Sequence, residues 1–158
     1  MLGMKNWNIS IQDPGEFTLS ADARCADTDY VNDHIWELRY KNIEPPALAV
    51  QTTYGLRARS FRIFPRFIED DSVVLDPNDF TTLPTIHKFG PNFVSLSYAP
   101  FSGIKIDADY FVPTSHVLVG KVTITNNKLK DRLIRLEIAA LLVPDRKGRG
   151  MTTKRIEN

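Results

Sequence analysis

Alternation of apolar and polar residues is the strongest pattern in this chain. It is clearest between Gly103 and Pro113, where the apolar positions are Ile104, Ile106, Ala108, Tyr110 and Val112. Lys105, Asp107 and Asp109 lie between them. Strict alternation over this length turns one side of an extended segment toward a core and the other toward water. The segment is therefore predicted to be an antiparallel β-strand.

The two segments that follow continue the pattern. The segment 116–125 would place on one face Leu118, Gly120, Val122 and Ile124. After a polar turn at 126–131, the segment 132–143 alternates again, so we predict a meander of three strands. A helix over 132–143 is the alternative, because its leucines also fit a 3.6-residue period. We favour a strand, since the neighbouring segments alternate and Pro144 ends the pattern abruptly.

Further strands are expected near 15–20, 35–41, 48–55, 59–68, 84–89 and 93–99. Turn signals such as Pro14-Gly15, Pro45-Pro46 and Gly90-Pro91 separate them. This spacing predicts an all-β fold, an antiparallel β-sandwich of two packed sheets with little helix. We assign the sandwich to residues 1–144 and treat the basic segment 145–158 as a tail or linker.

Composition narrows the class of protein. The chain has 158 residues, enough for one domain, and 42% apolar with 25% charged residues is ordinary globular usage. A net charge of +1 does not indicate a nucleic-acid or membrane partner. Cys25 has no partner for an internal disulfide. The longest apolar run, Ile138 to Val143, is far below the roughly 18 residues of a membrane span. We expect a cytoplasmic protein without a cofactor.

The segment from Gly55 to Phe67 is the main candidate contact surface. It contains three phenylalanines and four arginines, which are Arg57, Arg59, Arg62 and Arg66. In an extended chain the first two arginines share one face and the last two the other, unless Pro65 or a bulge changes the register. We favour packing against another domain. A structural role, in ion pairs with Glu69, Asp70 and Asp71, is equally part of the favoured prediction, and anion or substrate binding is the alternative.

The remaining polar groups give no catalytic or metal prediction. The acidic cluster Asp27, Asp29, Asp33 and His34 lacks the glycine and the ligand spacing of an EF-hand loop. Asp107 and Asp109 fall on the wet face of a predicted strand. The histidines, His34, His87 and His116, are isolated in sequence and show no zinc spacing.

Two aromatic residues are candidate carbohydrate contacts. Trp36 lies on a predicted strand, and Tyr54 ends another. Core packing is the favoured role for Trp36. The alternative is an exposed platform on which a sugar ring stacks.

Three stretches carry a family resemblance. They are 35–38 with 44–48, then 51–59, and finally 107–113 running into 122–126. The last reads Asp-Ala-Asp-Tyr-Phe-Val-Pro and then Val-Thr-Ile-Thr-Asn. It resembles the N-terminal β-sandwich of large bacterial carbohydrate-active enzymes whose catalytic part is an (α/α)6 barrel. That group includes cellobiose-phosphorylase-like and glucoamylase- or debranching-type proteins.

The resemblance implies a non-catalytic domain of a glycoside hydrolase or glycoside phosphorylase, which packs on the catalytic barrel of the same protein and helps to shape it. In such enzymes the catalytic general acid and its partner carboxylate lie mostly in the barrel, so we assign no catalytic residue here. One alternative is a carbohydrate-binding module that takes an oligosaccharide. Another is an adaptor that binds nucleic acid through Arg57–Arg66 and the basic tail, which the lack of interleaved aromatic residues in that tail disfavours.

Overall fold

The structure is a computed structural model that describes residues 6–10, 15–20, 34–41, 43–54 and 58–144. These residues form eleven strands and one short 3-10 helix. Within them, no helix has the length and apolar character needed to cross a membrane. The elements are β1 (Asn6–Ser10), β2 (Glu16–Ser20), β3 (Ile35–Arg39), β4 (Ala49–Tyr54), β5 (Ala58–Glu69), β6 (Ser72–Val74), η1 (Pro77–Asp79), β7 (Thr82–Gly90), β8 (Phe93–Ala99), β9 (Ile104–Thr114), β10 (Val117–Asn126) and β11 (Arg135–Pro144).

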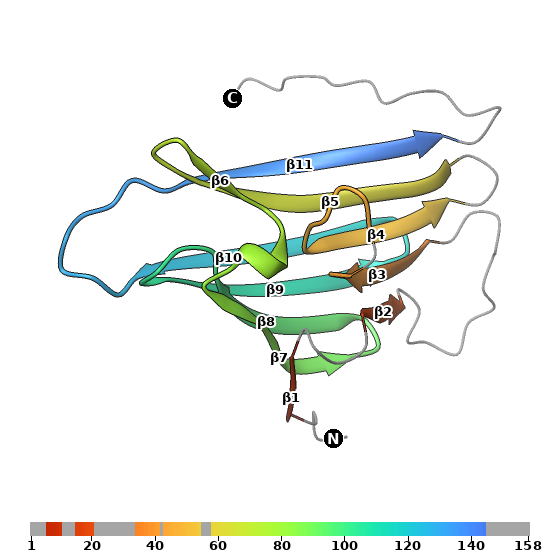
Figure 1. The fold of residues 1–158 in the computed structure, drawn as a ribbon. Helices are drawn as coiled ribbons and strands as arrows, with labels where there is room; N and C mark the ends of the chain where they lie inside the picture. The colour runs from red at the N-terminus through yellow and green to blue at the C-terminus, as the bar shows by residue number, and fades with distance from the viewer. Residues whose placement is uncertain (1–5, 11–14, 21–33, 42, 55–57, 145–158) are drawn as a thin grey trace, which may run out of the picture.

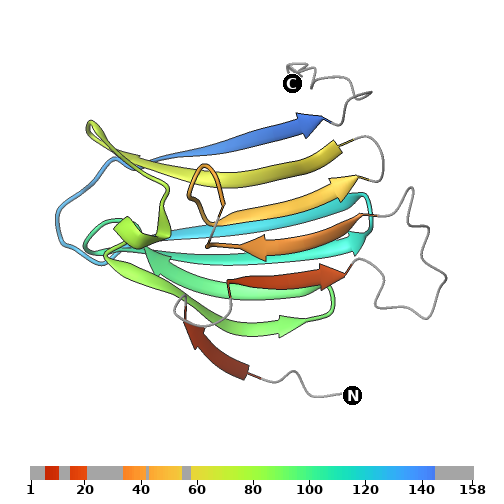
Figure 2. The same cartoon turned by 45° about the vertical axis from the view of Figure 1, so that its right-hand side comes forward.

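The strands form two antiparallel sheets that pack face to face (Figures 1 and 2). Sheet A has the order β1-β7-β8-β9-β10, and sheet B has the order β11-β5-β4-β3-β2, with β6 paired to β5. The predicted β-sandwich is confirmed. Most predicted strands agree with the structure to within one or two residues, whereas β1 and β6 were not predicted.

The predicted three-stranded meander is wrong in its last strand. Strands β8, β9 and β10 are consecutive neighbours, but β11 pairs with β5 in the other sheet. The connection 127–134 carries the chain between the sheets, as the loop on the left of Figure 1 shows. Alternation identifies a strand and its faces but not its neighbour. The helix alternative for 132–143 is also wrong, since β11 occupies most of this segment.

The core lies between the two sheets. All five apolar residues predicted to face inward from β9 are buried, namely Ile104, Ile106, Ala108, Tyr110 and Val112. An aromatic group packs close to them. Phe80 stacks on Tyr98 with ring centroids 5.1 Å apart, and Phe67 meets Tyr98 edge-on at 5.8 Å. Asp76 caps η1 through a 2.9 Å hydrogen bond from the Asn78 amide, which fixes the turn that leads to Phe80.

A smaller apolar cluster lies on the outer face of sheet B. Its buried members are Ala47, Ala49 and Phe64, and Ile43 and Leu75 pack against them. The β3–β4 connection and the end of β6 therefore cover part of a sheet face that would otherwise meet water.

Candidate interdomain surface

The arginine-rich segment forms most of β5, and a bulge divides it. Ala58 pairs with Pro144 and Ser60 with Val143, which leaves Arg59 as one extra residue on β5. Phe67 is buried on the inner face, and Arg62 and Arg66 belong to the opposite face. Arg59 is exposed, and Arg57 lies outside the described residues. The four arginines therefore do not form one continuous array.

Arg62 takes part in a polar network across the outer face of sheet B. Its Nε donates to Gln51 Oε1 at 2.7 Å, and its Nη1 donates to the Glu44 carbonyl. Gln51 in turn donates to Glu37 over 3.4 Å, and Arg39 lies 3.6 Å from that same carboxylate. These cross-strand contacts use the Arg62 guanidinium within the domain, which weakens its candidacy as an anion-binding group.

Arg66 is paired in the same way, with Nη1 3.1 Å from Glu137 Oε2 on β11. Glu69, which was a predicted partner of the arginine segment, instead binds Arg132 in a two-point ion pair. Its oxygens lie 2.6 Å from Arg132 Nε and 2.5 Å from Nη2. The hydrogen bonds from Arg132 lower the pKa of Glu69. This partner lies far away in the sequence, and no local pattern indicated it.

Trp36 is buried, with 4% of its surface exposed, and its Nε1 donates to the Ser115 carbonyl at 2.9 Å. Its ring meets Phe61 edge-on at 6.4 Å. An indole in this position packs in the core and offers no open ring face. Tyr54 ends β4, but its side chain lies outside the described part of the chain.

Two of the histidines lie closer together than the sequence indicated. The ring centroids of His34 and His116 are 5.0 Å apart, and Ser115 Oγ lies 2.9 Å from His116 Nδ1. These two histidines are therefore isolated in the sequence but neighbours in the fold. Zinc sites take three or four protein ligands, and the described residues contain no group of three possible ligands. The acidic cluster from Asp27 to Asp33 lies outside them.

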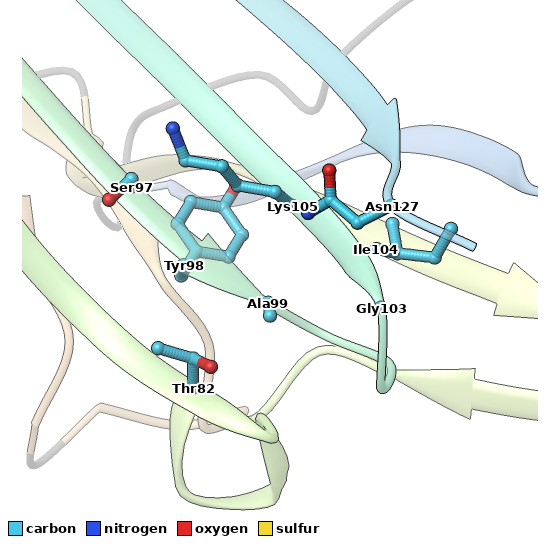
Figure 3. A pocket seen from close by; sticks show the side chains of 8 residues that line it. All are labelled: Thr82, Ser97, Tyr98, Ala99, Gly103, Ile104, Lys105 and Asn127. Atoms are coloured by element: carbon cyan, nitrogen blue, oxygen red, sulfur yellow. The ribbon is translucent and has the colours of Figure 1, made fainter.

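A shallow pocket of about 300 Å³ lies at one end of sheet A, and Figure 3 shows its lining. It is lined by Thr82, Ser97, Tyr98, Ala99, Gly103, Ile104, Lys105 and Asn127. The Lys105 ammonium is already paired with Asp107 at 2.8 Å. Burial raises the pKa of the Tyr98 phenol well above its usual value.

His87 lies next to Ser97, with Nε2 2.6 Å from Oγ. A serine nucleophile needs such a base, but the base in turn needs a carboxylate on its other nitrogen. Here Asp107 is the cross-strand neighbour of Ser97, on the side away from β7 and His87. We therefore assign no catalytic role to this pair.

The most distinctive surface is formed by the two edge strands β10 and β11 with the connection 127–134, which we call the open flank. Both strands lie at the same side of the sandwich (Figures 1 and 2). Among the residues that the structure describes, eleven large apolar side chains are exposed. Eight of them belong to the open flank, namely Val117, Val119, Ile124, Leu129, Leu133, Ile138, Leu141 and Val143.

An apolar groove of about 210 Å³ runs into the sandwich from the open flank. Its walls come from both sheets and are Val50, Ile63, Phe64, Pro65, Tyr110, Leu118, Gly120, Val122 and Ile138. Ile138, at its mouth, is 62% exposed. Burial raises the pKa of Tyr110 to about 12, which agrees with the dry character of this groove.

The open flank is also basic. Basic residues outnumber acidic ones there, whereas the whole chain is nearly neutral. The basic residues are Lys121, Lys128, Lys130, Arg132 and Arg135, and the acidic residues are Asp131 and Glu137. The sequence predicted the strands and their apolar faces here, but it did not indicate that no other described segment covers these faces. The available signal in the sequence was the pair Leu129 and Leu133, which lie among polar residues in the connection 127–134.

Comparisons with known protein families, with curated protein sequences and with solved structures found no significant match. The relationship to carbohydrate-active enzymes therefore stays a prediction from the sequence motifs.

Proposed function

We propose that this β-sandwich is a non-catalytic domain that packs on another domain through the open flank. The exposed apolar groove carries the proposal, because large uncovered apolar patches mark sites of association. Covering the exposed part of Ile138 alone would contribute roughly 1–2 kcal/mol to association. Arg62 and Arg66, which were candidate contacts, are held by partners within the domain and are secondary to this surface.

We further propose that the complete protein is a carbohydrate-active enzyme, a glycoside hydrolase or glycoside phosphorylase with an (α/α)6 catalytic barrel. This part rests on the resemblance of 107–113 and 122–126. Those segments lie in β9 and β10, so the family-like motif runs directly into the open flank. A domain that packs on a barrel needs an apolar surface of this kind, which agrees with the proposal.

The proposal that this domain is non-catalytic is tested with the purified chain. We expect no hydrolysis and no phosphorolysis of maltose- or cello-oligosaccharides, and no heat of binding in calorimetric titrations with the same sugars. Turnover that survives rigorous purification would contradict a non-catalytic role, and micromolar sugar binding would favour a carbohydrate-binding module instead. The proposal that the complete protein has an (α/α)6 catalytic barrel is tested by its gene. We expect the native reading frame to continue beyond Asn158 into several hundred residues with helical patterning.

A further inference from the structure

Strand β11 has the composition of an interior strand but lies at the edge of sheet B. Its segment 138–143 reads Ile-Ala-Ala-Leu-Leu-Val, the longest apolar run of the chain. Strands with apolar residues on both faces are normally covered on both faces and flanked on both edges. Here one edge pairs with β5 and the other is free of any described strand. Ile138 and Leu141, on opposite faces, are both exposed.

Between Glu137 and Pro144, the free edge also lacks the devices that usually protect one. Natural edge strands are short, or carry charges and prolines that discourage pairing. The edge strands at the opposite side of the sandwich, β1 and β2, have 5 residues each, whereas β10 and β11 have 10 each. From Ile138 to Val143, β11 has neither a charge nor a proline.

We propose that the open flank binds an extended segment of the domain on which it packs, and that this segment adds to β11 as an antiparallel β-strand. The inference rests on the proposed packing function and names its mode. Apolar side chains of the added strand would enter the groove beside Ile138, and its backbone would pair with the free edge of β11. The added strand would make β11 an interior strand, as its composition requires.

Charge indicates the chemistry of that segment. The connection that leads into β11 contains Lys128 and Lys130, which form no ion pair with any residue the structure describes, together with Asp131, whereas Arg135 at the start of the strand is paired with Glu137 at 3.3 Å. An antiparallel partner brings its C-terminal end to this basic end, so that end should be acidic. A second copy of the chain would bring the end of its own β11 there, and the sequence directly after Pro144 begins with one acidic residue, Asp145, followed by Arg146, Lys147 and Arg149. Self-pairing is therefore the less complementary arrangement.

The test uses the whole chain and a synthetic probe. The probe is a fluorescent ten-residue peptide that alternates valine and threonine and ends in three glutamates. We expect saturable binding by fluorescence anisotropy, with hydrogen-exchange protection of the outward amides of β11. A peptide that ends in three lysines should bind at least 10-fold more weakly. Ile138→Asp should abolish binding, whereas Val73→Asp, at an exposed position of β6, should not change it.

N-methylated probes distinguish backbone pairing from simple apolar contact. Methyl groups on the amides that face β11 should abolish binding, and methyl groups on the alternate amides should leave it intact. Equal binding of both methylated forms, an unaffected Ile138→Asp variant, or no binding by any probe would overturn the proposal. Protection of β11 through a dimer of the chain, detected by sedimentation without peptide, would overturn it in favour of self-pairing. None of these outcomes depends on the glycoside assays.

Discussion

Strands β9 and β10 are neighbours in one sheet and share one apolar pattern, yet their inner faces differ. They pair residue by residue, with Ile106 opposite Ile124 and Ala108 opposite Val122. Ile106 is fully buried, whereas Ile124 is 39% exposed. The difference lies in what faces each strand, because Ile106 belongs to the core cluster shared with sheet B and β10 lies at the margin.

We infer from this comparison that an apolar face has two different roles in this domain. In the centre, around β8 and β9, it stabilises the fold. On the open flank some apolar residues, such as Val122 and Leu136, still pack against the core, and we propose that the exposed ones, such as Ile138, meet a partner. Mutations should therefore separate the two regions, since the same chemical change has different consequences in each.

The largest expected contrast is between Phe67 and Ile138. Phe67 is fully buried and contacts both Phe80 and Tyr98. Phe67→Ala should lower the free energy of unfolding by about 3–5 kcal/mol, because a cavity is added to the lost burial. Ile138→Ala should change it by no more than about 0.5 kcal/mol, as is usual for surface positions. Urea denaturation measures both, and equal losses would show that the flank is part of the stabilising core.

A turn beside the flank gives the second contrast. Gly103 has a φ of +79°, and a Cβ there would lie 2.5 Å from Lys128 Cε. Gly103→Ala should cost about 1–2 kcal/mol, because left-handed backbone is unfavourable for residues with a Cβ. Lys128 is flexible and can move, so adding Lys128→Ala should not restore the loss. Full rescue in the double variant would instead identify the contact with Lys128 as the cause.

Strand positions and faces were predictable from the sequence because they depend on local alternation. The five buried residues of β9 and the end of β11 at Pro144 illustrate this. The bulge at Arg59 was foreseen only as one possibility, since extra residues in a strand leave no clear mark in the sequence.

Long-range partners were not predictable. The pairing of β11 with β5, the ion pair of Glu69 with Arg132, and the contact of His34 with His116 all depend on how the sheets are assembled. The candidate site shows the same limit. Sequence reasoning selected the arginines and Trp36 by residue type, whereas the open flank is defined by the absence of a covering strand among the described residues, which only the assembled sheets reveal.

The ion pair of Glu69 with Arg132 gives a pH-dependent prediction that concerns how the flank is joined to the centre. Arg132 also donates to the Ser102 carbonyl at 2.5 Å, so it connects the start of β11 to both sheets. The folded-state pKa of Glu69 lies below its ordinary value of 4.5. Its pairing therefore stabilises the fold above that pH and is lost as the pH falls through the lowered pKa.

Glu69→Gln should accordingly lower the free energy of unfolding near pH 7, by less than Gly103→Ala does. The difference in free energy of unfolding between this variant and the unmodified protein should shrink as the pH falls below about 4.5. Urea midpoints between pH 3 and 7 measure this, with Asp71→Asn, at an exposed turn position, as the control. A constant difference across that range would mean that the glutamine disturbs packing rather than removing a charge.

The smallest expected effect concerns Gly120, which faces the groove from β10. A Cβ there would lie 3.3 Å from Tyr110 Cε1, so the ring must move by a few tenths of an ångström. In the closed centre such crowding would be costly, since packed side chains have nowhere to go. On the open flank the groove leaves space for the ring, and alanine is intrinsically better than glycine in a strand by roughly 0.5–1 kcal/mol. Gly120→Ala should therefore be neutral or slightly stabilising in urea denaturation. A loss of 1 kcal/mol or more would mean that Tyr110 is held as rigidly as the core, and the distinction between centre and flank would have to be redrawn at that residue.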